Sequence, residues 1–282
     1  MSLRKTLASH LLARTLLVLS VGSAWSVHAQ PTDGCDQDYC AQDAVFQTGP
    51  LQALMVGVLE SPVAFSTGLA HGDFGMGGLS PLDGEVIVLN GQVYHARLDG
   101  QLRRVNPNER TSILMIKRFV ADRTLNLSSV SSMDDLTAQL DRHLHALNRI
   151  HAIRIDGRFD RLRLRSVPRQ SPPYAPVTEV VKSQHVLELE NAEGTIVAFR
   201  FPQWAVGINS PGYHMHFVNA ARNQGGHVLD VRGQGLAAQV DTTRAVTVMT
   251  PDDPMFDNAV FDEDENAPAY QEALRPGNGK RK

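Results

Sequence analysis

The segment from Pro168 to Pro176 most constrains how this chain folds, because it holds four prolines in nine residues. Proline lacks a backbone N–H donor, so neither a helix interior nor a central strand continues through such a segment. We therefore place a domain boundary at residue 168. The two sides of this boundary have different patterns.

The segment before the boundary, residues 46–167, combines helical and extended patterns and predicts an α/β domain. Asn90-Gly91 separates two β-prone runs and favours the type I′ turn of a hairpin. Ser132 and Asp135 form a capping-box pattern ahead of leucines at helical spacing. The predicted elements are helices over 51–60 and 132–150 and strands over 85–89, 92–96, 111–120 and 158–165.

The segment after the boundary, residues 168–250, is almost wholly β-prone. Glycine, proline and asparagine separate its short runs, which is typical of a sandwich or barrel. Residues 251–282 are acidic and then basic, with little periodicity, and are interpreted as a tail. The predicted strands cover 185–189, 195–201, 213–218, 227–231, 237–240 and 245–249.

The first 29 residues have the pattern of a secretory signal peptide. Basic residues precede an apolar run over 16–24, and Val27-His28-Ala29 offers a cleavage site before Gln30. The alternative is an uncleaved membrane anchor, for which the apolar run is short. We expect an exported protein, periplasmic or extracellular, that has no membrane segment after cleavage.

A polar tail over residues 30–45 follows and contains both cysteines of the chain, Cys35 and Cys40. An oxidising compartment permits a disulfide between them, and two free thiols are the alternative. The formal net charge is −3 and 6% of residues are aromatic, which argues against a nucleic-acid partner.

The strongest chemical signal is the pair His214 and His216. Residues two apart on a strand point to the same face, so both imidazoles can bind one ion. His227 opens the next predicted strand after a short turn, and a hairpin brings it beside the pair. Three imidazoles with open positions are typical of catalytic zinc, while manganese, iron and copper remain alternatives. The plainer interpretation is a polar strand face.

Two further residues are candidates. Glu85 follows a glycine-rich segment over 71–84 and starts a predicted strand, where it is a metal ligand, an acid/base group or an edge charge. Arg165 ends a predicted strand just before Pro168, and its side chain suits carboxylate binding or a solvated surface. His71 lies in the glycine-rich segment and is expected to support the site. His143, His145 and His151 are expected to be solvated.

These motifs, in their order, resemble the α-acetolactate decarboxylase family. The resemblance extends from about Phe46 to Asp230. It is carried by HGDFGMG and LDGE (71–77 and 82–85), RSVP (165–168), PVTEVVKSQ (176–184), PGYHMHF (211–217) and GGHVLD (225–230).

The resemblance implies an α/β (α+β) fold, with an N-terminal mixed-sheet domain followed by a mainly antiparallel, β-barrel-like domain that binds zinc. It also implies a homodimer. His214, His216 and His227 match the zinc ligands of the family, and Glu85 and Arg165 match its active-site residues. The family adds a glutamate from its C-terminal tail, for which Glu272 is our candidate and Glu265 the alternative. It usually carries threonine where this chain has Gly78.

The implied reaction is the zinc-dependent decarboxylation of 2-acetolactate, a 2-hydroxy-3-oxo acid, to acetoin through a metal-stabilised enediolate. Arg165 would orient the carboxylate, and Glu85 or the tail glutamate would deliver a proton. Two alternatives remain open. An exported zinc metallohydrolase needs the three histidines but has no use for Arg165, and a non-catalytic metal-binding module needs neither Glu85 nor Arg165.

Overall fold

The computed structural model describes residues 43–261 of the chain, which form a mixed α/β structure with two sheets. The predicted signal peptide, both cysteines and Glu265 and Glu272 lie outside these residues. None of the helices in the described range is both long and apolar enough to cross a membrane.

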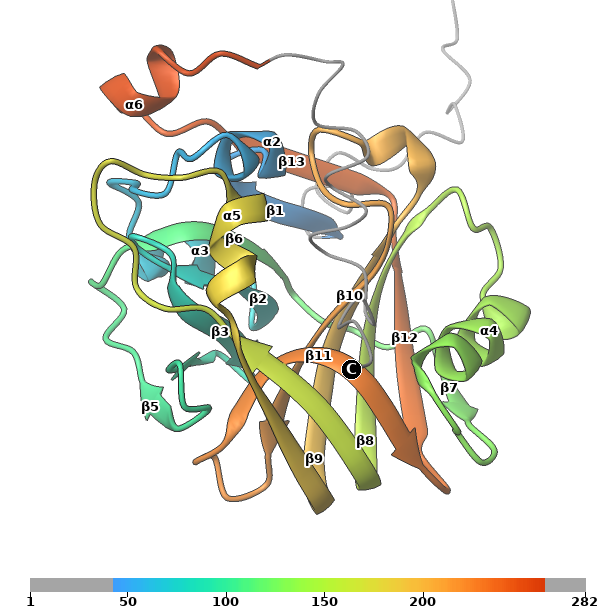
Figure 1. Ribbon diagram of the computed structural model, residues 1–282. Helices are drawn as coiled ribbons and strands as arrows, with labels where there is room; N and C mark the ends of the chain where they lie inside the picture. The colour runs from blue at the N-terminus through green and yellow to red at the C-terminus, as the bar shows by residue number, and fades with distance from the viewer. Residues whose placement is uncertain (1–42, 262–282) are drawn as a thin grey trace, which may run out of the picture. The chain divides into compact units, whose positions relative to one another are not determined.

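The first sheet contains seven strands of the described chain (Figure 1). β1 and β13 pair in parallel and the other neighbours pair antiparallel, so the predicted mixed sheet is confirmed. Asn90 and Gly91 form the predicted hairpin turn, with φ of 52° and 72°. The strands in spatial order are β13 (Ala245–Met249), β1 (Ala44–Thr48), β6 (Thr111–Lys117), β2 (Phe74–Leu79), β3 (Asp83–Leu89), β4 (Gln92–Ala96) and β5 (Leu102–Arg104).

The second sheet contains six strands in the described range, and its strand pairs are antiparallel. β11 pairs with both β10 and β8, which closes β8, β9, β10 and β11 into a ring of pairings. The barrel-like domain was predicted within residues 168–250, whereas this ring includes β8, which precedes residue 168. In spatial order the strands are β11 (Gly225–Gly233), β10 (Gly212–Asn219), β9 (His185–Phe201), β8 (Ile150–Ser166), β12 (Ala237–Thr243) and β7 (Arg123–Asn126).

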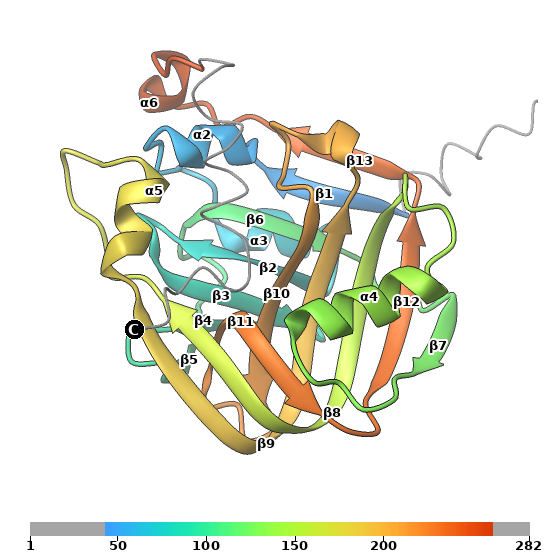
Figure 2. The same ribbon diagram turned by 45° about the vertical axis from the view of Figure 1, so that its right-hand side comes forward.

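Apolar side chains join the two sheets and attach the main helix. One buried cluster combines Phe74 and Ile87 of the first sheet with Val197 and Phe199 of the second. A second cluster lies under α4 (Met133–His143), which crosses the second sheet in Figure 2. The remaining helices are short: α2 (Leu51–Met55), α3 (Phe65–Leu69), α5 (Val177–Val180), α6 (Pro254–Asp257) and the 3-10 turns η1 (Val181–Ser183) and η2 (Gln203–Ala205).

Several predicted boundaries are wrong. α2 ends at Met55 rather than at residue 60, and α4 ends at His143 because Leu144 adopts an extended backbone and buries its side chain in the core. The two strands predicted over 185–201 are one long strand, β9. His151, expected to be solvated, is fully buried on β8, whereas His143 and His145 are exposed.

The sheets also do not divide the chain at residue 168. β7 and β8 precede the proline-rich segment, yet they pair with β12, β9 and β11, which follow it. β13 returns from the C-terminal side to pair with β1. The proline-rich segment therefore connects two neighbouring strands of one sheet.

Candidate active site

Strand alternation places the histidines between the two sheets. Met215 and Phe217 of β10 point into the core under α4, so His214 and His216 point to the opposite face, toward the first sheet. The hairpin of β10 and β11 sets His227 directly beside His216. The predicted convergence of the three imidazoles is therefore present in the fold.

The ligand atoms of these three histidines lie within 4.8 Å of one another. The Nε2 atoms of His214 and His216 are 3.1 Å apart, close to the roughly 3.3 Å expected for two nitrogens on one tetrahedral zinc ion with bonds near 2.0–2.1 Å. His216 Nδ1 is 2.8 Å from the Val86 carbonyl oxygen. Because a carbonyl only accepts, Nδ1 donates and the Nε2 lone pair faces the other histidines.

Burial keeps the three imidazoles neutral. It lowers the pKa of His216 to about 4 and holds the pKa values of His214 and His227 well below the usual range. The positive charge of Arg165 acts in the same direction at all three. Since a metal binds the neutral imidazole, the set is prepared for an ion near neutral pH.

Glu85 reaches the histidines from the first sheet. Ile87 and Leu89, two and four residues further along β3, point into the interface between the sheets. Because alternate residues of a strand share a face, Glu85 points there too. Its Oε2 lies 3.4 Å from His216 Nε2. Burial raises the pKa of this carboxyl to about 7, against the opposing effect of Arg165. A group of this kind both holds and releases a proton near neutral pH.

Arg165 lies at the same level of the sheet as His216 and His227, across the neighbouring strands β10, β11 and β8. β11 pairs with β8 so that His227 is beside Arg165, and only 5% of Arg165 is exposed. Its Nη1 donates to Gln184 Oε1 at 3.2 Å. Burial lowers the pKa of the guanidinium, while the Glu85 carboxylate raises it. Arg165 is therefore a buried residue of the site rather than a surface arginine.

Asp83 and His95 are neighbours of this site that the sequence did not indicate. Asp83 lies two residues before Glu85, yet its Oδ1 is 3.7 Å from His95 Nε2 and its Oδ2 is 3.6 Å from Arg169 Nη1. His95 is 2% exposed. The sequence places Asp83 two residues before Glu85, which could have drawn attention to Asp83. It does not reveal that the Asp83 and Glu85 carboxylates have different partners.

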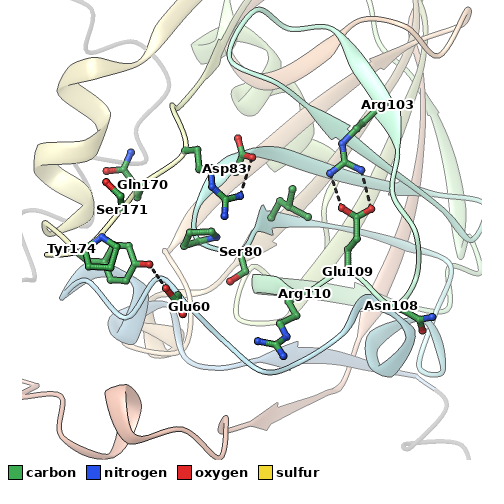
Figure 3. Close-up of a pocket in the computed structure, with 14 residues that line it drawn as sticks. Glu60, Ser80, Asp83, Arg103, Asn108, Glu109, Arg110, Gln170, Ser171 and Tyr174 are labelled. Carbon is green, nitrogen blue, oxygen red and sulfur yellow. Dashed lines mark hydrogen bonds and ion pairs between the residues drawn. The ribbon is translucent and has the colours of Figure 1, made fainter.

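Asp83 lines a cavity of about 540 Å³ that includes neither Glu85, Arg165 nor any of the three histidines (Figure 3). The charges in this cavity largely pair with one another. Arg103 donates to Glu109 through two bonds of 2.8 and 2.7 Å, and Tyr174 donates to Glu60. The metal-ligand candidates are thus separate from this polar cavity.

His71 is not among the neighbours of the histidine group. Its ring stacks on Phe46, with centroids 3.8 Å apart. Gly78 lies on β2, where an added Cβ would be 3.1 Å from Leu82 Cδ1. The site as described combines a potential metal position, an acid/base group and a carboxylate-binding cation, which suits metal-assisted chemistry on a small acid.

Known proteins match the same part of the chain. The model of the protein family alpha-acetolactate decarboxylase matches residues 45–263 of the chain. The chain is similar to the alpha-acetolactate decarboxylase of Methanosarcina mazei, with 37% identity over 78% of this chain and 76% of that protein. It is also similar to the Bacillus subtilis enzyme of that name, with 33% identity over 77% of this chain and 86% of that protein.

A solved structure agrees with the sequence matches. The crystal structure of alpha-acetolactate decarboxylase from Bacillus subtilis strain 168 superposes with a TM-score of 0.80 and 31% identity. The match covers 82% of this chain and 99% of that one. The sequence model, the relatives and the fold therefore agree, and the chain belongs to the alpha-acetolactate decarboxylase family of carboxy-lyases.

Proposed function

We propose that this protein decarboxylates 2-acetolactate to acetoin and carbon dioxide and that it depends on zinc. The observation that carries the proposal is the convergence of three neutral imidazoles, Glu85 and Arg165 in one largely buried site. Membership of the decarboxylase family supports the same reaction.

The donor set fits zinc. His214, His216 and His227 would hold the ion through imidazole nitrogens, and the described chain brings no thiolate to them, as is typical of a catalytic rather than a structural site. When bound, zinc would supply positive charge that stabilises the negative charge left by the loss of carbon dioxide.

Arg165 binds the carboxylate of the substrate. A planar guanidinium donates two parallel hydrogen bonds to a carboxylate and so fixes its plane. Decarboxylation requires the breaking C–C bond to lie out of the plane of the ketone, so that its electron pair passes into the carbonyl system. The fixed position of Arg165 between β11 and Gln184 supports this orientation.

Glu85 delivers the proton that completes the reaction. Loss of carbon dioxide leaves an enediolate, and the carbon that carried the carboxylate must gain a proton. The O–H bond of protonated Glu85 breaks and a C–H bond forms at that carbon. A carboxyl with a pKa of about 7 is protonated in a large share of molecules near neutral pH.

The two other function classes have less support. A zinc metallohydrolase requires a metal-bound nucleophile but gives no role to Arg165, which is buried beside His227. A non-catalytic binding module has no need for a carboxyl whose pKa is raised to about 7.

We also infer that the protein is exported and forms a homodimer. Export is supported by the basic and apolar pattern of residues 1–29 and predicts a mature N-terminus at Gln30. The dimer is supported by the family resemblance. N-terminal sequencing of the secreted form and its sedimentation in solution test these two inferences.

The central test is acetoin formation from racemic 2-acetolactate by the purified protein. Treatment with a chelator should abolish activity, and added zinc should restore it; manganese, iron and copper provide separate arms. His216→Gln should lose zinc and more than about 100-fold in activity, because altering only the partner of a metal ligand costs about 10–100-fold. His145→Gln, at an exposed histidine, is the matched control. A folded, zinc-loaded protein that makes no acetoin would contradict the proposal.

A further inference from the structure

A short segment after Arg165 connects the two sheets at the active site. The Ser166 hydroxyl donates to the Ala96 carbonyl oxygen at 3.0 Å, and the Gly84 N–H donates to the Val167 carbonyl oxygen at 3.1 Å. Ser166 is 0% exposed. The first bond joins the last residue of β8, in the second sheet, to β4 of the first sheet, and the second joins the residue after β8 to β3.

Both bonds reach the immediate surroundings of Glu85. Ala96 on β4 is the strand partner of Glu85 on β3. Gly84 precedes Glu85, has a φ of +64°, and lies so close to β4 that an added Cβ would be 2.1 Å from the Ala96 oxygen. The Ser166 hydroxyl therefore bonds to the carbonyl against which the backbone before Glu85 is packed.

The other end of this connection is Arg165 itself. Arg165 and Ser166 are consecutive on β8, where they pair with Val186 and His185 of β9. The position of the arginine relative to the carboxyl thus depends on how β8 is held against β3 and β4.

We propose that Ser166 is a positioning residue, whose hydrogen bond to Ala96 sets the distance and direction between Glu85 and Arg165. This inference rests on the proposed function. In that reaction Arg165 holds the carboxylate of the substrate, and the carbon that receives the proton is the one that carried this carboxylate. The relative placement of the two side chains therefore decides how well, and from which face, Glu85 delivers the proton.

The test replaces the Ser166 hydroxyl. Ser166→Ala removes the donor, and Ser166→Cys keeps most of the volume with a much weaker donor. Ser61→Ala is the matched control, because it removes another buried hydroxyl, one that accepts from the Val63 N–H in a loop that supplies none of the site residues. All variants are measured for zinc content, thermal midpoint, kcat, KM and the enantiomeric composition of the acetoin.

We expect both Ser166 variants to bind zinc normally and to lose about 10- to 100-fold in kcat, the scale that a misplacement of about 1 Å produces. KM should change little, since the metal and Arg165 still bind the substrate. The excess of one acetoin enantiomer should fall, because solvent then competes with Glu85 as the proton source. Ser61→Ala should retain wild-type kcat and enantiomeric composition.

A double-mutant cycle with Glu85→Gln separates positioning from general stability. If Ser166 acts through Glu85, Ser166→Ala should cost little further activity once Glu85 is replaced. Additive losses, or Ser166 variants with wild-type kcat and enantiomeric composition, would overturn the inference. Failure of the proposed function is a different result: the unmodified, zinc-loaded protein would then make no acetoin.

Discussion

Two clusters of buried polar groups join the same two sheets, and they are built in opposite ways. In one, Lys117 of β6 donates to Asp43, Asp241 and Thr243 at 3.0, 2.5 and 2.7 Å, and Asp241 also accepts from the Val120 N–H. In the other, three imidazoles and the Glu85 carboxyl converge, with Arg165 beside them. We call them the Lys117 cluster and the histidine cluster.

The difference lies in how charge is compensated. Lys117 is 0% exposed, but its ammonium has opposite charges and hydrogen-bond acceptors around it. In the histidine cluster, burial makes the imidazoles neutral and raises the pKa of Glu85 to about 7. Burial also raises the pKa of Asp241, but the charge and hydrogen bond of Lys117 oppose that shift. The neutral imidazoles and a carboxyl with a pKa of about 7 are typical of a site that acts on a ligand. We therefore expect the two clusters to respond to mutation in opposite ways.

The largest expected effect is on stability at the Lys117 cluster. Lys117→Met leaves Asp241 buried without its cation, and removing one partner of a buried ion pair costs about 3–5 kcal/mol in the free energy of unfolding. Urea unfolding at pH 7.5 measures this change. Activity per folded molecule and zinc content should stay at wild-type values, since this cluster contributes no group to the site.

Arg103→Gln provides the control for this prediction, because it breaks a half-exposed ion pair with Glu109. Screening by solvent limits such a pair to less than about 1 kcal/mol. If Lys117→Met costs no more than Arg103→Gln, or if it abolishes zinc binding, the proposed division between a structural and a functional cluster is wrong.

The next effect is on activity at the histidine cluster. Glu85→Gln keeps the shape of the side chain but removes its acid/base function, so acetoin formation should fall by at least about 100-fold. The free energy of unfolding should stay within about 1 kcal/mol of wild type, because a neutral amide replaces a carboxyl that is costly to ionise when buried. Turnover, zinc content and urea unfolding are measured on the same samples.

Full turnover by a Glu85→Gln protein with normal zinc content would remove Glu85 from the mechanism. A fall in stability as large as that of Lys117→Met would mean that Glu85 is mainly a structural group. Either result would remove the contrast between the clusters.

The histidine cluster was predictable because its signal is local. Alternation along one strand fixes the shared face of His214 and His216, and a short turn brings back His227. The hairpin at Asn90 has the same local character. Arg165 could be placed only through the family resemblance, since nothing in its own segment indicates that β8 pairs with β11.

The Lys117 cluster was not predictable because its partners are distant in the sequence. In the sequence, Lys117 is a polar residue at the end of one β-prone segment, and Asp241 is a charged residue at the end of another. They meet because β6 and β12 belong to different sheets that pack together. The burial of His151 and the sheet pairing across residue 168 have the same origin, since long-range packing rather than local pattern determines them.

His151 gives the smallest effect, and it concerns pH. It lies on β8 beside Thr242 of β12, with Nδ1 3.3 Å from the Thr242 hydroxyl and Nε2 3.4 Å from the Ala146 oxygen. Burial lowers its pKa to about 4, with Arg200 and Arg123 acting in the same direction and Asp122 against it. Below about pH 6.5 the unfolded chain therefore binds a proton that the folded protein does not, so stability falls between pH 6.5 and 4.

At pH 5 this difference amounts to about 1–2 kcal/mol, which His151→Gln should remove. Urea unfolding of the metal-free protein at pH 7.5 and 5.0 measures it, because the histidine cluster is identical in both proteins and cancels in the comparison. His145→Gln, at an exposed position, should keep the full pH dependence of the wild type. Equal losses in all three proteins would mean that His151 is not the source of the acid sensitivity.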